Sequence, residues 1–205
     1  MLGPAEIFTL FFVTLGPLKV LDPFAQRTRG LGDATVREIA VRAFVIATIA
    51  IVVGGLLGRV LLPKWHISLA AMELTGGIVF FLVALKQLLE QYEPSRTEPA
   101  EPLPASPTAA AARLVFPIVL TAYGIAAVIA LLAESDRPER TATILILLLI
   151  VMVLDLLAML YARRILVGPT IIVLQVLGAV LAVLQVGLSI QLILAGLRTL
   201  GVIPG

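Results

Sequence analysis

Four ionisable residues interrupt long apolar stretches of the chain and are the first candidates for chemistry: Lys19, Asp22, Glu73 and Asp155. A charged side chain inside a bilayer is unfavourable unless it is paired or hydrated, so such residues often bind a solute or carry a proton. No nucleophile–base pair, phosphate-binding loop or paired general acid and base accompanies them. The sequence therefore favours solute binding and proton exchange, and we do not expect an enzyme.

Lys19 and Asp22 are three residues apart, a spacing that places both side chains on one face of a helix and lets them pair. Gly16 and Pro17 precede them and predict an interruption, because proline removes a backbone donor and clashes with the preceding turn. Pro23 is expected to end the helix that carries the pair. A neutralised pair beside an interrupted helix would suit a zwitterionic ligand. In the alternative, Asp22 marks the cytoplasmic edge of the span and Lys19 reaches the interface.

Glu73, Asp155 and Asp22 are the candidates for proton coupling. Glu73 lies about 9 Å into its apolar stretch at 1.5 Å per residue, too deep for a short side chain to reach the interface. Gly76 and Gly77 follow one turn later and allow another helix to approach closely. In the alternative, Glu73 is a protonated group that hydrogen-bonds a neighbouring helix, and Asp155 pairs with a cation from another span.

Neutral polar groups also lie inside apolar stretches. Thr121 and Tyr123 follow Pro117 in the middle of the fourth stretch, where hydroxyl groups near a backbone irregularity could hydrogen-bond a ligand. Gln175 lies near the start of the last stretch and is the further binding candidate. Side chains of this kind more often join helices, and the last stretch carries two more of them, Gln185 and Gln191.

The composition is that of an integral membrane protein. Hydrophobic residues make up 60% of the chain and charged residues only 14%, with a mean hydropathy of +1.09. So few charges cannot cover the surface of a water-soluble domain, and no basic face for nucleic acid is present. With no cysteine and a single histidine, His66, the sequence offers no metal cluster and no cofactor motif.

Six apolar stretches are each long enough to cross the membrane as helices, which need roughly 20 residues. Their continuous apolar character argues against a barrel, whose strands alternate. We therefore predict an all-α polytopic protein with six transmembrane helices, broken or kinked in the first and fourth at Pro17 and Pro117. The expected spans are residues 5–22, 42–62, 67–88, 113–133, 141–161 and 170–197.

The chain divides into two halves of three spans each. Residues 1–90 form the first expected unit, residues 91–112 a Pro-rich cytoplasmic linker, and residues 113–205 the second unit. Because three spans precede the linker, the second unit starts from the opposite face, so a repeat would be inverted. Pro17 and Pro117 correspond in the two halves, and the Glu73-x-x-Gly-Gly pattern is echoed by Gln175-x-x-Gly-Ala.

The distribution of basic residues predicts the orientation. Basic residues concentrate in cytoplasmic loops, and one set of loops holds nine Lys and Arg residues against five in the opposite set. Both termini are therefore expected outside the cell. The nine residues are Arg27, Arg29, Arg37, Arg42, Lys86, Arg96, Arg113, Arg163 and Arg164.

The chain resembles the MarC family of bacterial and archaeal inner-membrane proteins. The resemblance is clearest from Arg29 to Ala71, in the run Thr75-Gly-Gly-Ile-Val-Phe-Phe-Leu-Val-Ala-Leu85, and in the run Gln191-Leu-Ile-Leu-Ala-Gly-Leu197. It implies six spans in two inverted triplets, a location in the inner membrane, and transport of neutral amino acids, as described for some members.

Several motif positions differ from the family pattern. The Asn-Pro-x-Gly element of the first span reads Gly16-Pro17-Leu18-Lys19, and the Gly-Pro-Gly element of the fourth span reads Thr121-Ala122-Tyr123. Glu73 stands where many members carry a basic residue. The resemblance therefore transfers the fold more directly than the substrate.

From residues and resemblance together we expect a secondary transporter or exporter of a small polar or zwitterionic solute, with possible proton coupling. The expected partners are membrane lipid and this solute, and homo-oligomers could form through the Gly54 and Gly58 face. The alternative is a lipid-headgroup translocase or lipid-binding scaffold. A transporter requires a polar cavity lined by spans one, three, four and six, whereas a translocase should open sideways to lipid.

Overall fold

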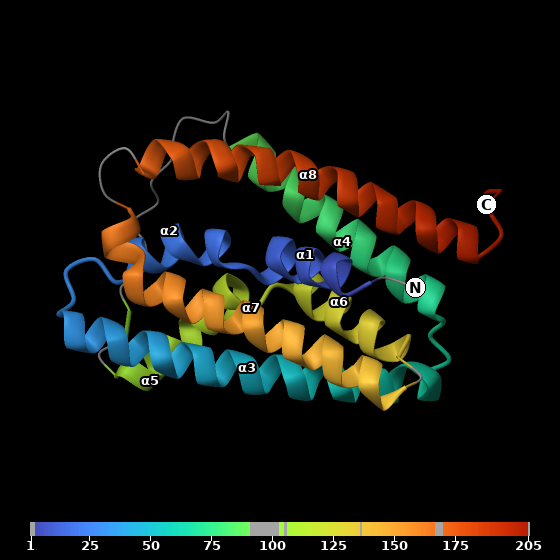
Figure 1. The fold of residues 1–205 in the computed structure, drawn as a ribbon, viewed down its shortest axis with the longest axis horizontal. Helices are drawn as coiled ribbons and strands as arrows, with labels where there is room; N and C mark the ends of the chain where they lie inside the picture. Colours follow the sequence, from blue (N-terminus) through green and yellow to red (C-terminus); the bar gives the residue numbers. More distant parts are fainter. Residues whose placement is uncertain (1–2, 91–102, 105, 136, 167–169, 205) are drawn as a thin grey trace.

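The computed structural model describes residues 3–90, 103–104, 106–135, 137–166 and 170–204. These residues form helices and no strands, so the all-α prediction is confirmed (Figure 1). Most of the expected linker lies outside the described residues. The elements are α1 (Pro4–Leu15), α2 (Pro17–Arg27), α3 (Asp33–Lys64), α4 (Leu69–Glu90), α5 (Pro107–Leu114), the π-helical segment η1 (Val115–Val119), α6 (Ala122–Ala133), α7 (Pro138–Ile165) and α8 (Thr170–Thr199).

Six membrane spans account for these elements. Five helical segments are long and apolar enough to cross a bilayer, and α1 with α2 counts as one of them. A sixth span is made by α5–η1 and α6 together, which are bent by 71°. The six-span prediction is thus confirmed, with one broken span at the start of each half.

The first span breaks at Gly16, as the Gly-Pro pair predicts. Gly16 is extended (φ −71°, ψ 172°), its N–H donates to the Phe12 carbonyl, and Pro17 is the first residue of α2. A Cβ atom on Gly16 would lie 2.0 Å from the Phe12 carbonyl oxygen, so only glycine fits. The expectation that Pro23 ends the helix is wrong, because α2 continues through it to Arg27. A proline removes a single backbone donor, and neighbouring spans can hold such a helix together.

The fourth span breaks between Leu114 and Ala122. Phe116 is extended (φ −125°, ψ 129°) and precedes Pro117 through a cis peptide bond. Leu120 and Thr121 are also extended before α6 begins. The predicted interruption near Pro117 is therefore present. The two broken spans run in opposite directions along the molecule, as an inverted repeat requires, and the repeat itself stays a prediction (Figure 1).

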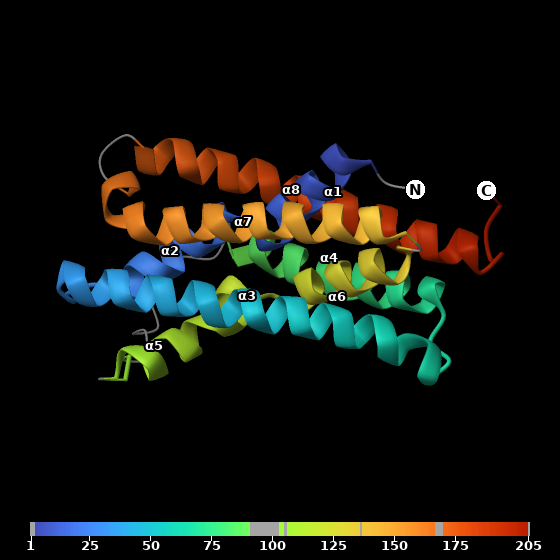
Figure 2. The same cartoon turned by 60° about the horizontal axis from the view of Figure 1, so that its bottom comes forward.

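The helices form two packed bodies. The larger body contains α1, α2, α3, α5, η1, α6 and α7, which share one apolar core that includes Phe11, Phe24 and Met152. The second body is the pair α4–α8, whose helices pack closely against each other (Figure 2). A small buried cluster of Val13, Phe80 and Tyr123 joins the two bodies.

Candidate functional site

The two breaks lie side by side, and side chains hydrogen-bond the backbone groups that the first break leaves without helical partners. The Thr121 hydroxyl donates to the Thr14 carbonyl at 3.0 Å and accepts the Gly124 N–H at 3.2 Å. The Gln185 amide in α8 donates to the Val13 carbonyl at 3.0 Å. Interrupted helices within a membrane require such partners, because lipid offers none. The break in span one is therefore bonded to spans four and six.

One turn beyond this break, Lys19 contacts an aromatic pair contributed by two other spans. The rings of Phe80 in α4 and Tyr123 in α6 stack with centroids 4.7 Å apart and planes 19° apart. The Lys19 ammonium donates a hydrogen bond to the Tyr123 hydroxyl and lies 4.3 Å from the Tyr123 ring centroid. Both rings are buried, at 1% and 2% exposure. An ammonium over aromatic faces is attracted by the negative face of each ring.

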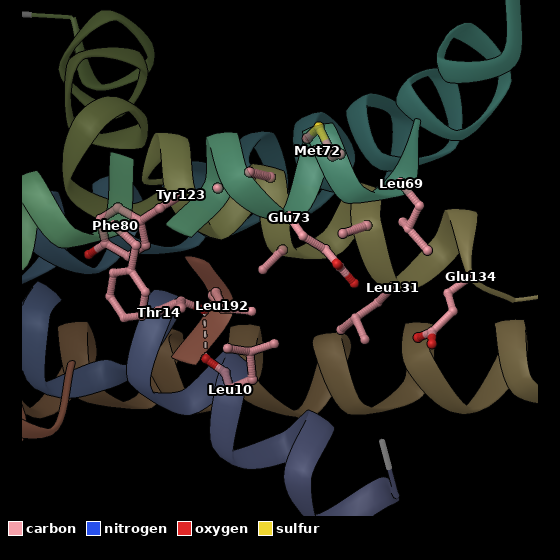
Figure 3. A pocket seen from close by; sticks show the side chains of 14 residues that line it. Leu10, Thr14, Leu69, Met72, Glu73, Phe80, Tyr123, Leu131, Glu134 and Leu192 are labelled. Carbon is pink, nitrogen blue, oxygen red and sulfur yellow. Dashed lines mark hydrogen bonds between the residues drawn. The ribbon is translucent and has the colours of Figure 1, made fainter. Parts of the chain in front are cut away.

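A pocket begins at the same aromatic pair and extends toward the α3–α4 and α6–α7 connections. It holds about 70 Å³, well below the roughly 300–1,000 Å³ of pockets for drug-sized ligands, and therefore suits a small solute. Phe80 and Tyr123 lie at one end and Glu134 near the other, with the Glu73 carboxyl pointing into the space between (Figure 3). The lining comes from α1, α4, α6, the residue after α6, and α8: Leu10, Thr14, Leu69, Met72, Glu73, Gly76, Phe80, Tyr123, Ala126, Ala127, Ala130, Leu131, Glu134 and Leu192.

The pocket is mostly apolar and has two carboxyl groups. One Glu73 carboxyl oxygen is buried without a hydrogen-bond partner in the described chain. Glu134 is paired with Arg140 at 3.0 Å, so its charge is compensated. Glu73 is thus the pocket's uncompensated acidic group and can bind a cationic group of a solute or take up a proton. Among the described residues, no cluster of three or more His, Cys, Asp or Glu side chains could hold a metal ion.

The structure brings several of the predicted site residues together. Gly16, Lys19, Thr121 and Tyr123 lie at the junction of the breaks, and Glu73 lies in the pocket that starts there. Pro17 begins α2 at the same break.

Other predicted residues lie apart from this junction or outside the description. Asp22 is exposed and accepts a hydrogen bond from Gln26 at 2.8 Å, whereas Lys19 bonds Tyr123, so the expected Lys19–Asp22 pair is not formed. Pro117 is exposed. The side chain of Gln175 lies outside the described part of the chain.

Asp155 lies in the core of the larger body. Its exposure is 0%, and neither carboxyl oxygen has a hydrogen-bond partner in the described chain. Its helix, α7, packs against α1, α2 and α3. The expected cation partner from another span is absent from the described residues, so Asp155 remains the second candidate for carrying a proton.

Four residues carried no binding prediction: Thr14, Phe80 and Gln185 at the junction, and Glu134 near the other end of the pocket. Phe80 is one of eight phenylalanines, and nothing in its local sequence marks its partner, Tyr123. Gln185 was expected to join helices, and its bond to Val13 confirms that expectation. The sequence signal for Glu134 was its place directly after an apolar stretch.

Comparison with known proteins agrees with this architecture. The family model described as "MarC family integral membrane protein" matches residues 5–200, nearly the whole chain. No curated protein and no solved structure matches. With six spans and a family match of this extent, the chain is an integral membrane protein that belongs to the MarC family.

Proposed function

We propose that this protein is a secondary transporter or exporter of a small polar or zwitterionic solute, such as a neutral amino acid, in the cytoplasmic membrane of a bacterium or archaeon. The observation that carries the proposal is the meeting of two broken spans at a pocket lined by spans one, three, four and six. These are the spans expected to line a transporter's cavity; the cavity is mostly apolar rather than polar, and its polar character comes from Glu73 and Glu134. Broken helices at a pocket expose helix ends whose partial charges suit polar solutes.

Two charged side chains in and beside the pocket, Glu73 and Lys19, match the two opposite charges of a zwitterion. Glu73 lies in the pocket, whereas Lys19 contacts the far side of the Phe80–Tyr123 pair and is not among the pocket's lining residues. Glu73 would bind the ammonium group of a solute entering the pocket. Lys19 would bind the carboxylate of the solute after the aromatic pair separates. The Lys19 ammonium would then give up its hydrogen bond to the Tyr123 hydroxyl for a stronger one to a charged acceptor.

The division of the protein into two bodies suggests how a solute could pass from the pocket to Lys19. The pocket lies between the α4–α8 pair and the α1 and α6 segments of the larger body. Movement of the pair against the larger body would separate Phe80 from Tyr123 and expose Lys19. Rocking of one bundle against another around a central site is the usual form of alternating access.

The proposal is tested by counterflow in proteoliposomes, with labelled alanine, serine and leucine as probes. We expect exchange of at least one of them, and Lys19→Met should abolish it while leaving the protein folded. Absence of exchange for all neutral amino acids, together with movement of fluorescent lipids between leaflets, would favour the headgroup-translocase alternative instead.

Proton coupling has its own test. Glu73→Gln should remove the pH dependence of uptake, because an amide cannot exchange a proton. Glu139→Gln is the matched control, since Glu139 is an exposed carboxylate outside the pocket. If Glu73→Gln keeps the pH dependence of uptake and Asp155→Asn loses it, Asp155 carries the proton. If both variants keep the pH dependence, neither residue couples transport to protons.

A further inference from the structure

A second cavity lies at the opposite end of the molecule from the mouth of the pocket, between the start of α3 and the end of α7. It is a groove of about 460 Å³ with an apolar floor that includes Phe24, Val36 and Met159. Its rim is basic and consists of Arg37, Arg163 and Arg164, with one acidic residue, Asp33. The groove therefore combines an apolar interior with a net positive rim.

The three arginines have different roles. Arg163 is held by the fold, because it pairs with Asp33 at 2.6 Å and donates to the Thr28 and Leu31 carbonyls at 2.9 and 2.6 Å. Arg37 and Arg164 are exposed and have no acidic partner among the described residues. Asp33 compensates Arg163, so two uncompensated guanidinium groups remain at the rim.

The groove continues into apolar surface on both helices. On α3, exposed Val41, Val45 and Ile49 follow Arg37 at intervals of four residues. Such intervals place side chains along one face of a helix.

On α7, a second exposed row leads to the groove from the membrane interior. Val153, Leu157 and Tyr161 lie four residues apart and end one turn before Arg164, whose guanidinium lies 5.9 Å from the Tyr161 ring. Each free arginine thus sits at the end of an exposed apolar row.

We propose that this groove binds an anionic phospholipid, with the phosphate between Arg37 and Arg164 and the acyl chains along the two apolar rows. Guanidinium groups form paired hydrogen bonds to phosphate oxygens, and basic pockets between spans bind anionic headgroups. A soluble phosphate would use the arginines alone, whereas the apolar rows are complementary only to a ligand with hydrocarbon chains. The proposal does not depend on transport.

The test is thermal unfolding of the purified, delipidated protein in an uncharged detergent. Phosphatidylglycerol should stabilise it at a concentration at least about tenfold lower than phosphatidylcholine does, because its net negative headgroup complements the two basic side chains. Glycerol phosphate and inorganic phosphate should have no comparable effect. Equal stabilisation by the two lipids would overturn the proposal, and equal stabilisation by glycerol phosphate would show a site for soluble anions in place of a lipid site.

Variants identify the groove. Arg37→Gln with Arg164→Gln should abolish the preference for phosphatidylglycerol, whereas Arg37→Lys with Arg164→Lys should keep most of it. The matched control is Lys64→Gln with Arg198→Gln, which removes two exposed charges at the ends of α3 and α8, away from the groove. An equal loss in the control would show that total charge, and not this groove, sets the preference.

Discussion

The larger body and the α4–α8 pair are packed in different ways. In the larger body, small residues face side chains: a Cβ atom on Gly55 would meet Val128 and Leu132 side chains at 2.6 and 3.0 Å. In the pair, small residues face backbone as well as side chains: the nearest atoms to a Cβ on Gly77 and on Gly196 belong to the Ile193 and Leu74 side chains, at 2.8 and 2.7 Å, and backbone atoms are nearly as close. A Cβ on Gly77 would lie 2.9 Å from the Ile193 backbone nitrogen, and one on Gly196 would lie 3.0 Å from the Ala70 carbonyl oxygen.

Contacts between the two bodies lie mainly between α4 and α6 and include apolar packing around the Val13–Phe80–Tyr123 cluster. Next to the breaks they include the Phe80–Tyr123 stack and the Gln185–Val13 bond, while the Lys19–Tyr123 hydrogen bond, within the larger body, holds one ring of that stack. If the α4–α8 pair moves as a unit during transport, each body must be packed rigidly and the contacts between the bodies must be able to break and re-form. Mutations within the pair should therefore affect folding, whereas mutations at the junction should affect transport more than stability.

The largest effect is expected from Gly77→Ala. The new methyl group would contact backbone on α8, which cannot rotate away as a side chain can, so the two helices must separate. Overpacking of this kind costs about 1–3 kcal/mol, and we expect the upper end. The measurement is thermal unfolding in detergent. Gly187→Ala is the control because open space surrounds Gly187, and similar losses in the two variants would contradict close packing of the pair.

Tyr123→Phe should have the next largest effect, because it removes the acceptor of the Lys19 ammonium and keeps the ring stack. We expect a loss of about 1.5–2 kcal/mol, the lower part of the range for hydrogen bonds to charged groups. The aromatic pair should also separate more easily, so that the pocket becomes accessible from the side of the α2–α3 connection.

Because the chain has no cysteine, a single Ala126→Cys can report this change. Its labelling by an impermeant maleimide from the α2–α3 side should rise in Tyr123→Phe and stay low in Tyr161→Phe, where the tyrosine lies on the exposed face of α7. Equal labelling in both variants would show that the aromatic pair does not close the pocket.

Gln185→Leu should cost less, about 0.6 kcal/mol, the average measured for side-chain hydrogen bonds between membrane helices. The substitution leaves the buried Val13 carbonyl without its side-chain donor. Gln191→Leu is the control on the same helix, because Gln191 is exposed. Thermal unfolding of both variants measures the difference, and a loss in Gln191→Leu as large as in Gln185→Leu would argue against a specific contact between the bodies.

The sequence predicted the spans and both breaks because these depend on local features. Continuous apolar stretches and the positions of Gly16, Pro17 and Pro117 are visible in the chain itself. Pro23 was misread because a helix held by neighbouring spans tolerates a missing donor. The partner of Lys19 was also wrong, since Asp22 is three residues away in sequence but Tyr123, which is 104 residues away, is the residue in contact. Pairings of that kind depend on how spans pack, which periodicity does not encode.

Gly76→Ala should have the smallest effect on stability, although Gly76 is adjacent to Gly77. Its Cβ would meet only the Ala126 Cβ atom, at 3.6 Å, an ordinary van der Waals contact. Alanine also favours helix by about 1 kcal/mol over glycine, so the unfolding temperature should stay level or rise. The methyl group would nevertheless take up space in a pocket of about 70 Å³ and hold α4 against α6, so counterflow should slow. Normal counterflow in a stable Gly76→Ala protein would mean that solute does not pass between α4 and α6 at this contact.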